Sequence, residues 1–240
     1  MNNKKAQVTI FIIIAIVIVG AIILFFTFKD DIGKTFGSEN EALSSFVENC
    51  IEKTGKDAIY NIGQKGGYFY SPKLSTSNGI PYYYYEGDNE MHSKEEVEKE
   101  ISTYLNEMLT FCTGQFEDFP GLNITSGEVN TKTTIESDKI MLDVTFPLTV
   151  ISNNKNYIIE NFNKVEILIR VDLIYDSIEE LIKGQLGKEN ICLSCITKIA
   201  LKNDLKIDMT GAENATFFTI KDEHSKINGI PLEWKFANKY

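Results

Sequence analysis

Arginine and histidine are scarce in this sequence of 240 residues. Arg170 is the single arginine among 24 basic residues, and 34 acidic residues leave a formal net charge of −10. Proteins that bind nucleic acids need a clustered basic face, in which arginines fork onto phosphates and base edges. The composition therefore argues against a nucleic-acid partner.

The sequence also lacks the short motifs of common active sites. It contains no G-x-S-x-G and no H-E-x-x-H pattern, and its two histidines, His92 and His224, stand near acidic residues in expected loops. A serine–histidine–aspartate triad assembles in space, so spacing alone leaves that option open. We expect no catalytic residue, no cofactor and no metal site, and a binding or structural protein rather than an enzyme.

One long hydrophobic run stands near the start of the chain. Val8–Phe28 (VTIFIIIAIVIVGAIILFFTF) holds 21 residues without a charge. At about 1.5 Å per residue, a helix of that length crosses a hydrocarbon core about 30 Å thick. Lipid offers no partners for backbone amides, so only a helix is expected there. The sequence predicts a transmembrane helix over residues 8–28, with the lipid bilayer as its partner.

A cleaved secretory signal is the alternative interpretation of this run. Such signals have an apolar region of about 7–15 residues that ends in small residues. Here the run ends in Phe25-Phe26-Thr27-Phe28 with no A-x-A pattern, which favours an uncleaved anchor. Lys4 and Lys5 precede the run without an acid, and positive flanks stay on the cytoplasmic side. We expect a single-pass protein of the cell membrane, with residues 1–7 in the cytoplasm and most of the chain outside.

The residues around the start of this run carry a resemblance. The string Lys4–Phe11 (KKAQVTIF) resembles the opening of many uncharacterised archaeal single-pass membrane proteins. It is also faintly similar to archaeal class III (type IV pilin-like) signal sequences, which are cut just before a glutamine. That resemblance implies a cut between Ala6 and Gln7 and a filament subunit. Phe11 stands where those signals carry a glutamate.

The rest of the chain divides into a linker and a domain. Residues 29–37 hold two glycines and mixed charges, typical of a linker, which leaves residues 38–240 as the extracytoplasmic domain. Any subdivision of that domain is expected near residues 120–126. Hydrophobic residues make up 43% and charged residues 24% of the chain, an ordinary globular composition.

Helix and strand patterns are partly segregated along this domain. Capping boxes at residues 38–41 and 93–96, each followed by apolar residues three and four apart, predict helices over about 39–62 and 93–116. The aromatic segment 66–86 between them is predicted to form a hairpin with a long loop. Later patterns predict strands at 128–135, 140–150 and 157–171, helices at 172–184 and 193–202, and strands at 205–209, 217–220 and 232–236, the last after a turn at Asn228-Gly229. This order predicts an α+β fold with a largely antiparallel sheet.

The four cysteines suit disulfides in an oxidising compartment. Cys50 and Cys112 lie on the apolar faces of two predicted helices, so a bridge between those helices is expected. It would leave Cys192 and Cys195 to pair with each other. The alternative is that Cys50 and Cys112 are unpaired, small buried apolar residues.

The Cys192-Leu193-Ser194-Cys195 string has three interpretations. A structural disulfide is favoured, because no strand leads directly into the string and neither glycine nor proline separates the cysteines. The second is a thiol–disulfide oxidoreductase site, in which a helix start stabilises one thiolate. The third is zinc, for which one such pair supplies only two ligands.

Two further sets of residues could mediate contacts outside the cell. Six of the eleven tyrosines share one segment and could present an amphipathic strip to a protein or glycan: Tyr68, Tyr70, Tyr82, Tyr83, Tyr84 and Tyr85. The alternative is that they pack a hairpin against a helix. Asn123-Ile124-Thr125 and Asn214-Ala215-Thr216 fit the N-glycosylation pattern, so Asn123 and Asn214 are candidate acceptors.

Overall fold

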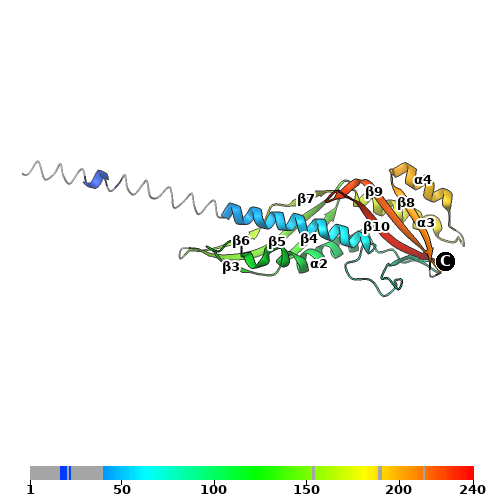
Figure 1. The fold of residues 1–240 in the computed structure, drawn as a ribbon, viewed down its shortest axis with the longest axis horizontal. Coiled ribbons are helices and arrows are strands. Elements are labelled where there is room, and N and C mark those ends of the chain that lie inside the picture. The colour runs from blue at the N-terminus through cyan, green and yellow to red at the C-terminus, as the bar shows by residue number, and fades with distance from the viewer. Residues whose placement is uncertain (1–16, 21, 23–39, 153–154, 189–190, 213) are drawn as a thin grey trace, which may run out of the picture. The chain divides into compact units, whose positions relative to one another are not determined.

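The structure is a computed structural model that describes residues 17–20, 22, 40–152, 155–188, 191–212 and 214–240. The chain divides into two compact units, Met1–Ser45 and Phe46–Tyr240. In the first unit, residues 17–20, 22 and 40–45 are helical. The second unit holds all the strands of the described chain together with several helices, and its fold is α+β as predicted (Figure 1).

Several predictions for the N-terminal region fall outside the described residues. These are the linker 29–37, Ser38 of the first capping box, and the span Val8–Phe28 apart from residues 17–20 and 22. Within the part of the chain that the structure describes, no helix is both long enough and apolar enough to cross a membrane.

Two long helices occupy the positions predicted for them. In the second unit, residues 46–64 are helical, and α2 spans Lys94–Thr113. The Ser93 hydroxyl accepts a hydrogen bond from the Glu96 amide at 3.2 Å, and the Glu96 carboxylate accepts one from the Ser93 amide at 2.6 Å. This reciprocal pair is the predicted capping box. The helix α2 ends at Gly114, which adopts a left-handed conformation, before the short 3₁₀ turn η1 (Gly114–Phe116).

The first sheet is built around one long strand, β5 (Lys139–Ser152). Successive stretches of β5 pair antiparallel with four shorter strands: β3 (Asn123–Ser126), β4 (Asn130–Ile135), β6 (Lys155–Asn161) and β7 (Val165–Leu168). Thr145 pairs with both Asn130 and Asn161, so β4 and β6 lie on opposite edges of β5 at that point. The single strand predicted over 157–171 is therefore wrong, since Phe162–Lys164 interrupt it between β6 and β7.

The second sheet joins the end of the chain to the tyrosine-rich segment. Its strand order is β2 (Asp88–Asn89), β1 (Tyr82–Tyr85), β10 (Ile230–Lys239), β9 (Ala215–Ile227) and β8 (Lys206–Ala212). The strands β8, β9 and β10 form the antiparallel run that the tail pattern predicts, and Asn228 and Gly229 both have positive φ in the turn. The strand β1 pairs parallel to β10.

The hairpin predicted over residues 66–86 is wrong. Tyr68–Tyr70 are not in a strand, and β1 finds its long partner at the other end of the sequence. Gly66 and Gly67 both have positive φ, and a Cβ on Gly66 would lie 2.5 Å from the Lys235 carbonyl oxygen. The turn at these glycines brings the chain close to β10. Because the backbone turns there, the aromatic residues that follow do not continue into a strand.

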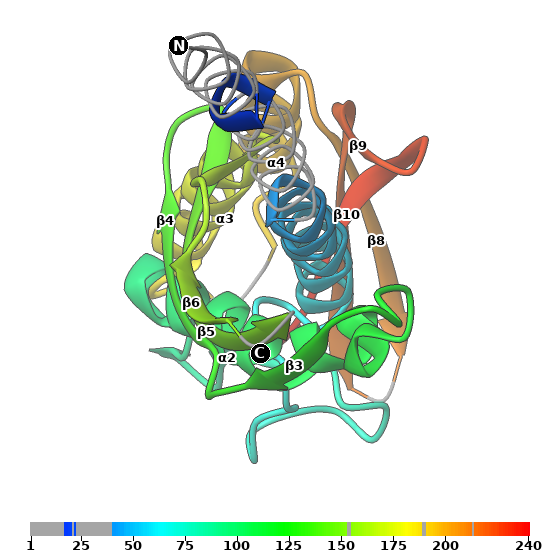
Figure 2. The ribbon, with the colours of Figure 1, turned by 90° about the vertical axis from the view of Figure 1, so that its left-hand side faces the viewer.

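Two further helices match the sequence pattern closely, and one earlier helix lies between the sheets. The helices α3 (Val171–Gln185) and α4 (Leu193–Asn203) follow the first sheet in the chain. In the helix over residues 46–64, a Cβ on Gly55 would collide with Leu142 of β5, and one on Gly63 would lie 2.6 Å from the Glu233 carbonyl oxygen of β10. This helix therefore touches both sheets and lies between them (Figure 2).

Candidate functional site

The two long helices of the domain are joined by a disulfide. Cys50 pairs with Cys112 of α2, with a Cα–Cα distance of 5.6 Å and a sequence separation of 62. The Cys50 side chain is 4% exposed. Cys112 is partly exposed. The bridge connects two helices, as predicted, with one buried end and one partly exposed end.

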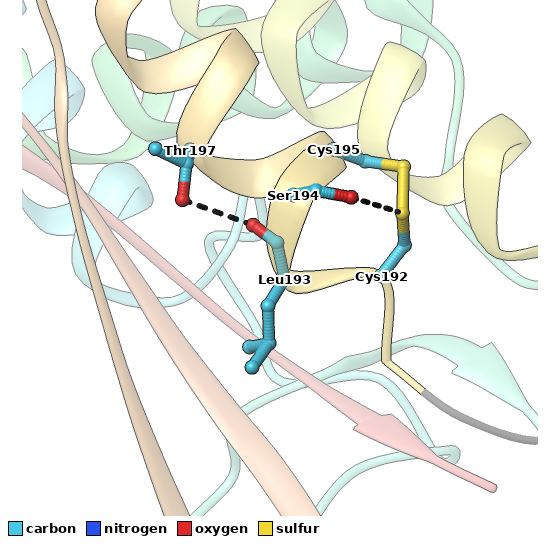
Figure 3. The surroundings of a disulfide bond; sticks show 5 residues. All are labelled: Cys192, Leu193, Ser194, Cys195 and Thr197. Atoms are coloured by element: carbon cyan, nitrogen blue, oxygen red, sulfur yellow. Dashed lines mark hydrogen bonds between the residues drawn. A yellow bond between two sulfur atoms is a disulfide. The ribbon is translucent and has the colours of Figure 1, made fainter.

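The second disulfide lies at the surface. Cys192 is the N-cap residue of α4 and pairs with Cys195 in its first turn, with a Cα–Cα distance of 5.2 Å (Figure 3). Both cysteines are partly exposed, and Leu193 between them is 61% exposed. The Ser194 hydroxyl lies 3.6 Å from the Cys192 sulfur. All four cysteines of the chain are thus paired as the sequence predicts.

The six predicted tyrosines do not share one exposed strip. Tyr83 and Tyr84 are buried, whereas Tyr70 is 63% exposed and donates its hydroxyl to Glu107 at 2.6 Å. Tyr82 and Tyr85 are partly exposed, with ring centroids 5.2 Å apart. Their burial departs from strict alternation because the register of β1 shifts between Tyr82 and Tyr84.

A buried aromatic cluster surrounds Tyr83. Its hydroxyl donates to the Gly66 carbonyl at 2.7 Å and accepts the Trp234 indole N–H at 2.9 Å. Burial raises the pKa of the Tyr83 phenol well above its ordinary value, although the Trp234 N–H opposes the shift. The fully buried hydroxyl thus has both a hydrogen-bond acceptor and a hydrogen-bond donor, as buried polar groups require.

His92 borders this cluster. Its ring stacks on Tyr68 at 4.0 Å between centroids, and its backbone carbonyl accepts the Tyr175 hydroxyl at 2.8 Å. The side chain is 8% exposed, and its Nε2 has no hydrogen-bond partner. Burial lowers the pKa of His92 to about 4, while the nearby Glu96 carboxylate works in the opposite direction. The imidazole is therefore neutral at ordinary pH.

The only arginine of the chain holds a fully buried carboxylate. Arg170 donates to both oxygens of Asp222, one of them from Nε at 2.9 Å, and its backbone amide donates to the Ser225 hydroxyl at 2.9 Å. Ser225 in turn donates to Asp222 at 2.5 Å. Burial raises the Asp222 pKa, but these hydrogen bonds and the guanidinium charge outweigh burial and leave it lowered. This group fixes the start of α3 to β9.

No catalytic triad or metal cluster forms in the described part of the chain. Ser225 bonds to Asp222 rather than to a histidine, and His224 Nε2 lies 2.6 Å from an Asp204 oxygen at the surface. Among the described residues, no group of three or more His, Cys, Asp or Glu side chains is placed to hold a metal ion.

An open pocket lies near the end of the second sheet. It has a volume of about 420 Å³ and is lined by Tyr84, Glu86, Gly87, Gly187, Lys188 and Tyr240. The rings of Tyr84 and Tyr240 lie 5.3 Å apart, and burial raises the pKa of the Tyr240 phenol. Tyr84, one of the six tyrosines singled out in the sequence, lines this pocket, and its role in ligand binding stays a prediction.

One face of the first sheet presents exposed, uncharged side chains where β3, β5 and β6 lie next to one another. Thr149 of β5 pairs with Thr125 of β3 and Ile158 of β6, and Ile151 pairs with Asn123 and Asn156. All six side chains are exposed. Asn123, a predicted glycosylation site, lies in this face, and Asn214, the other, is exposed with φ 58° in the turn between β8 and β9.

Comparisons of the chain with protein-family models, with curated proteins and with solved structures found no match. Function is therefore argued from the chain's own residues. The Arg170–Asp222 group and the Gly66–Tyr83–Trp234 cluster were not predicted. No local sequence pattern indicates them, because their partners lie 52 and 151 residues apart.

Proposed function

We propose that this chain is a membrane-anchored extracytoplasmic protein that acts at the cell surface as a binding or structural component. Val8–Phe28 would be the anchor, because it is an uncharged run long enough to cross a bilayer. Lys4 and Lys5 would keep the short N-terminus in the cytoplasm. The α+β domain would then face the outside.

The disulfide between Cys50 and Cys112 carries this proposal. A bridge between two helices, made by Cys50 at 4% exposure and the partly exposed Cys112, suits a domain that folds where thiols are oxidised. The second bridge leaves no free cysteine in the chain. The exposure of Asn123 and Asn214 adds support, since glycosylation requires an accessible asparagine.

Membrane fractionation with protease treatment of intact cells tests the location. We expect the full-length protein in the membrane fraction after alkaline washing, with its domain digested from outside. Replacing Ile13 and Val17 by aspartate should release the protein, because each charge costs about 3 kcal/mol at a helix centre. The matched control places the same two charges after the run, at Thr35 and Ser38, and should stay in the membrane. Wild-type protein in the soluble fraction would overturn the proposal.

A pilin-like filament subunit is the second candidate. It is supported by the resemblance of residues 4–11 to class III signal sequences. N-terminal sequencing of the mature protein distinguishes the two. A start at Gln7 would indicate processing, and a start at or next to Met1 would indicate an uncleaved anchor.

A further inference from the structure

The two disulfides of the domain occupy different environments. Cys50–Cys112 ties two long helices across 62 residues, whereas Cys192–Cys195 spans three residues within one helix turn. The short bridge removes little freedom from the unfolded chain, because loop-closure entropy grows with loop length. Cys192 and Cys195 are both partly exposed, whereas in the long bridge Cys50 is 4% exposed and only Cys112 is partly exposed. Both ends of the short bridge are therefore open to an attacking thiol.

The helix α4 does not depend on this bridge for its position. Ile196 and Ile199 are buried, and Asn203 donates to the Ser177 hydroxyl of α3 at 2.8 Å. Lys202 lies 3.1 Å from Glu180, also in α3. These contacts lie along the helix beyond the cysteines, so opening the bridge leaves α4 docked.

The start of α4 favours a negative charge on Cys192. No side chain caps the helix there, and its first turn carries no acid. The free amides of a first turn stabilise an anion at the N-cap position, which Cys192 occupies. The Ser194 hydroxyl, 3.6 Å from the Cys192 sulfur, can donate a further hydrogen bond to a thiolate.

We propose that Cys192–Cys195 is a reactive disulfide that exchanges electrons with a dithiol of a partner protein. A partner thiolate attacks the Cys195 sulfur, a new S–S bond forms, and the old bond breaks with its electron pair leaving on Cys192. The partner's second thiol loses its proton and attacks its own bridged sulfur, which releases Cys195. The partner dithiol becomes a disulfide, and the two cysteines take up the two electrons and two protons. The exposed Leu193 offers an apolar contact beside the sulfurs.

Graded reduction of the purified full-length protein in detergent tests the exchange. The probe is a series of reduced and oxidised dithiothreitol mixtures, followed by alkylation and mass mapping. We expect Cys192–Cys195 to open reversibly while Cys50–Cys112 stays closed and the circular dichroism spectrum is unchanged. Joint opening of both bridges, or opening only with unfolding, would overturn the proposal.

Single-cysteine variants test the chemistry of each sulfur. Cys195→Ser leaves the Cys192 thiol, and Cys192→Ser is its matched partner. We expect Cys192 to react with iodoacetamide at pH 7 roughly ten times faster than Cys195, with a midpoint below about pH 8.5. Ser194→Ala should reduce that rate. Equal rates for the two thiols would refute the assigned leaving group, and wild-type protein that fails to accelerate insulin reduction by dithiothreitol at least threefold over Cys192→Ser would refute the activity.

Discussion

At the scale of single residues, His92 is held where a positive charge is unfavourable. The imidazole is 8% exposed and stacked on Tyr68, and its Nε2 has no hydrogen-bond partner. Burial lowers its pKa from 6.5 to about 4 against the influence of Glu96. The folded protein therefore keeps His92 neutral at a pH where the unfolded chain would protonate it.

Replacing His92 by phenylalanine should flatten the pH dependence of stability between about pH 4 and 6.5. In this window the unfolded wild-type chain binds one more proton than the folded chain, so stability rises with pH. The contribution is complete above pH 6.5 and is lost as the pH falls to about 4, a change of about 3 kcal/mol. Urea unfolding across this range measures the slope. A slope retained in H92F would contradict the assignment.

At the scale of elements, α2 protects an edge of the first sheet. The Ser102 hydroxyl accepts the Thr133 amide at 3.1 Å, and the Glu98 carboxylate accepts the Ile135 amide at 2.7 Å. Both amides belong to β4 and point away from β5. A strand edge covered in this way cannot pair with another chain.

Replacing Ser102 by alanine should destabilise the domain by about 1–2 kcal/mol, because the partly buried Thr133 amide loses its acceptor. Thr103→Ala is the matched control. It removes a hydroxyl from the next position of the same helix, where Thr103 bonds only to the Lys99 carbonyl in solvent-exposed surroundings. That change should stay within about 0.5 kcal/mol. The free energy of unfolding in urea measures both, and equal losses would count against an edge-protecting role.

The elements that the sequence predicts well are those with local signals. The helices α2, α3 and α4 have apolar spacing of three and four, and Ser93 and Glu96 cap the first of them reciprocally. The strand β5 is likewise predicted from the alternation of apolar and polar residues within its own segment. The hairpin predicted over residues 66–86 does not form, because Gly66 contacts Lys235, far along the chain. No local pattern reveals that contact.

At the scale of the whole domain, the candidate sites also divide into those that the sequence predicts and those that depend on contacts between distant residues. The cysteine pairing was predictable, because an even count and two apolar helix faces allow few arrangements. The roles of the tyrosines were not, because Tyr83 bonds to Trp234 across 151 residues and Tyr82 to Tyr85 share a segment but not an environment. Similar side chains in one segment acquire different roles through tertiary packing.

The disulfide Cys50–Cys112 should contribute most of the covalent stabilisation of this domain. In the chain-entropy model, closing a separation of 62 residues is worth about 4 kcal/mol, against about 2 kcal/mol for Cys192–Cys195 with a separation of three. Cys50→Ala with Cys112→Ala should therefore lower the free energy of unfolding roughly two to three times as much as Cys192→Ser with Cys195→Ser. Urea unfolding of both double variants, followed by circular dichroism, measures the ratio. A larger loss from the exposed pair would mean that α4 needs its bridge to dock, and the division between a structural and an exchangeable disulfide would not hold.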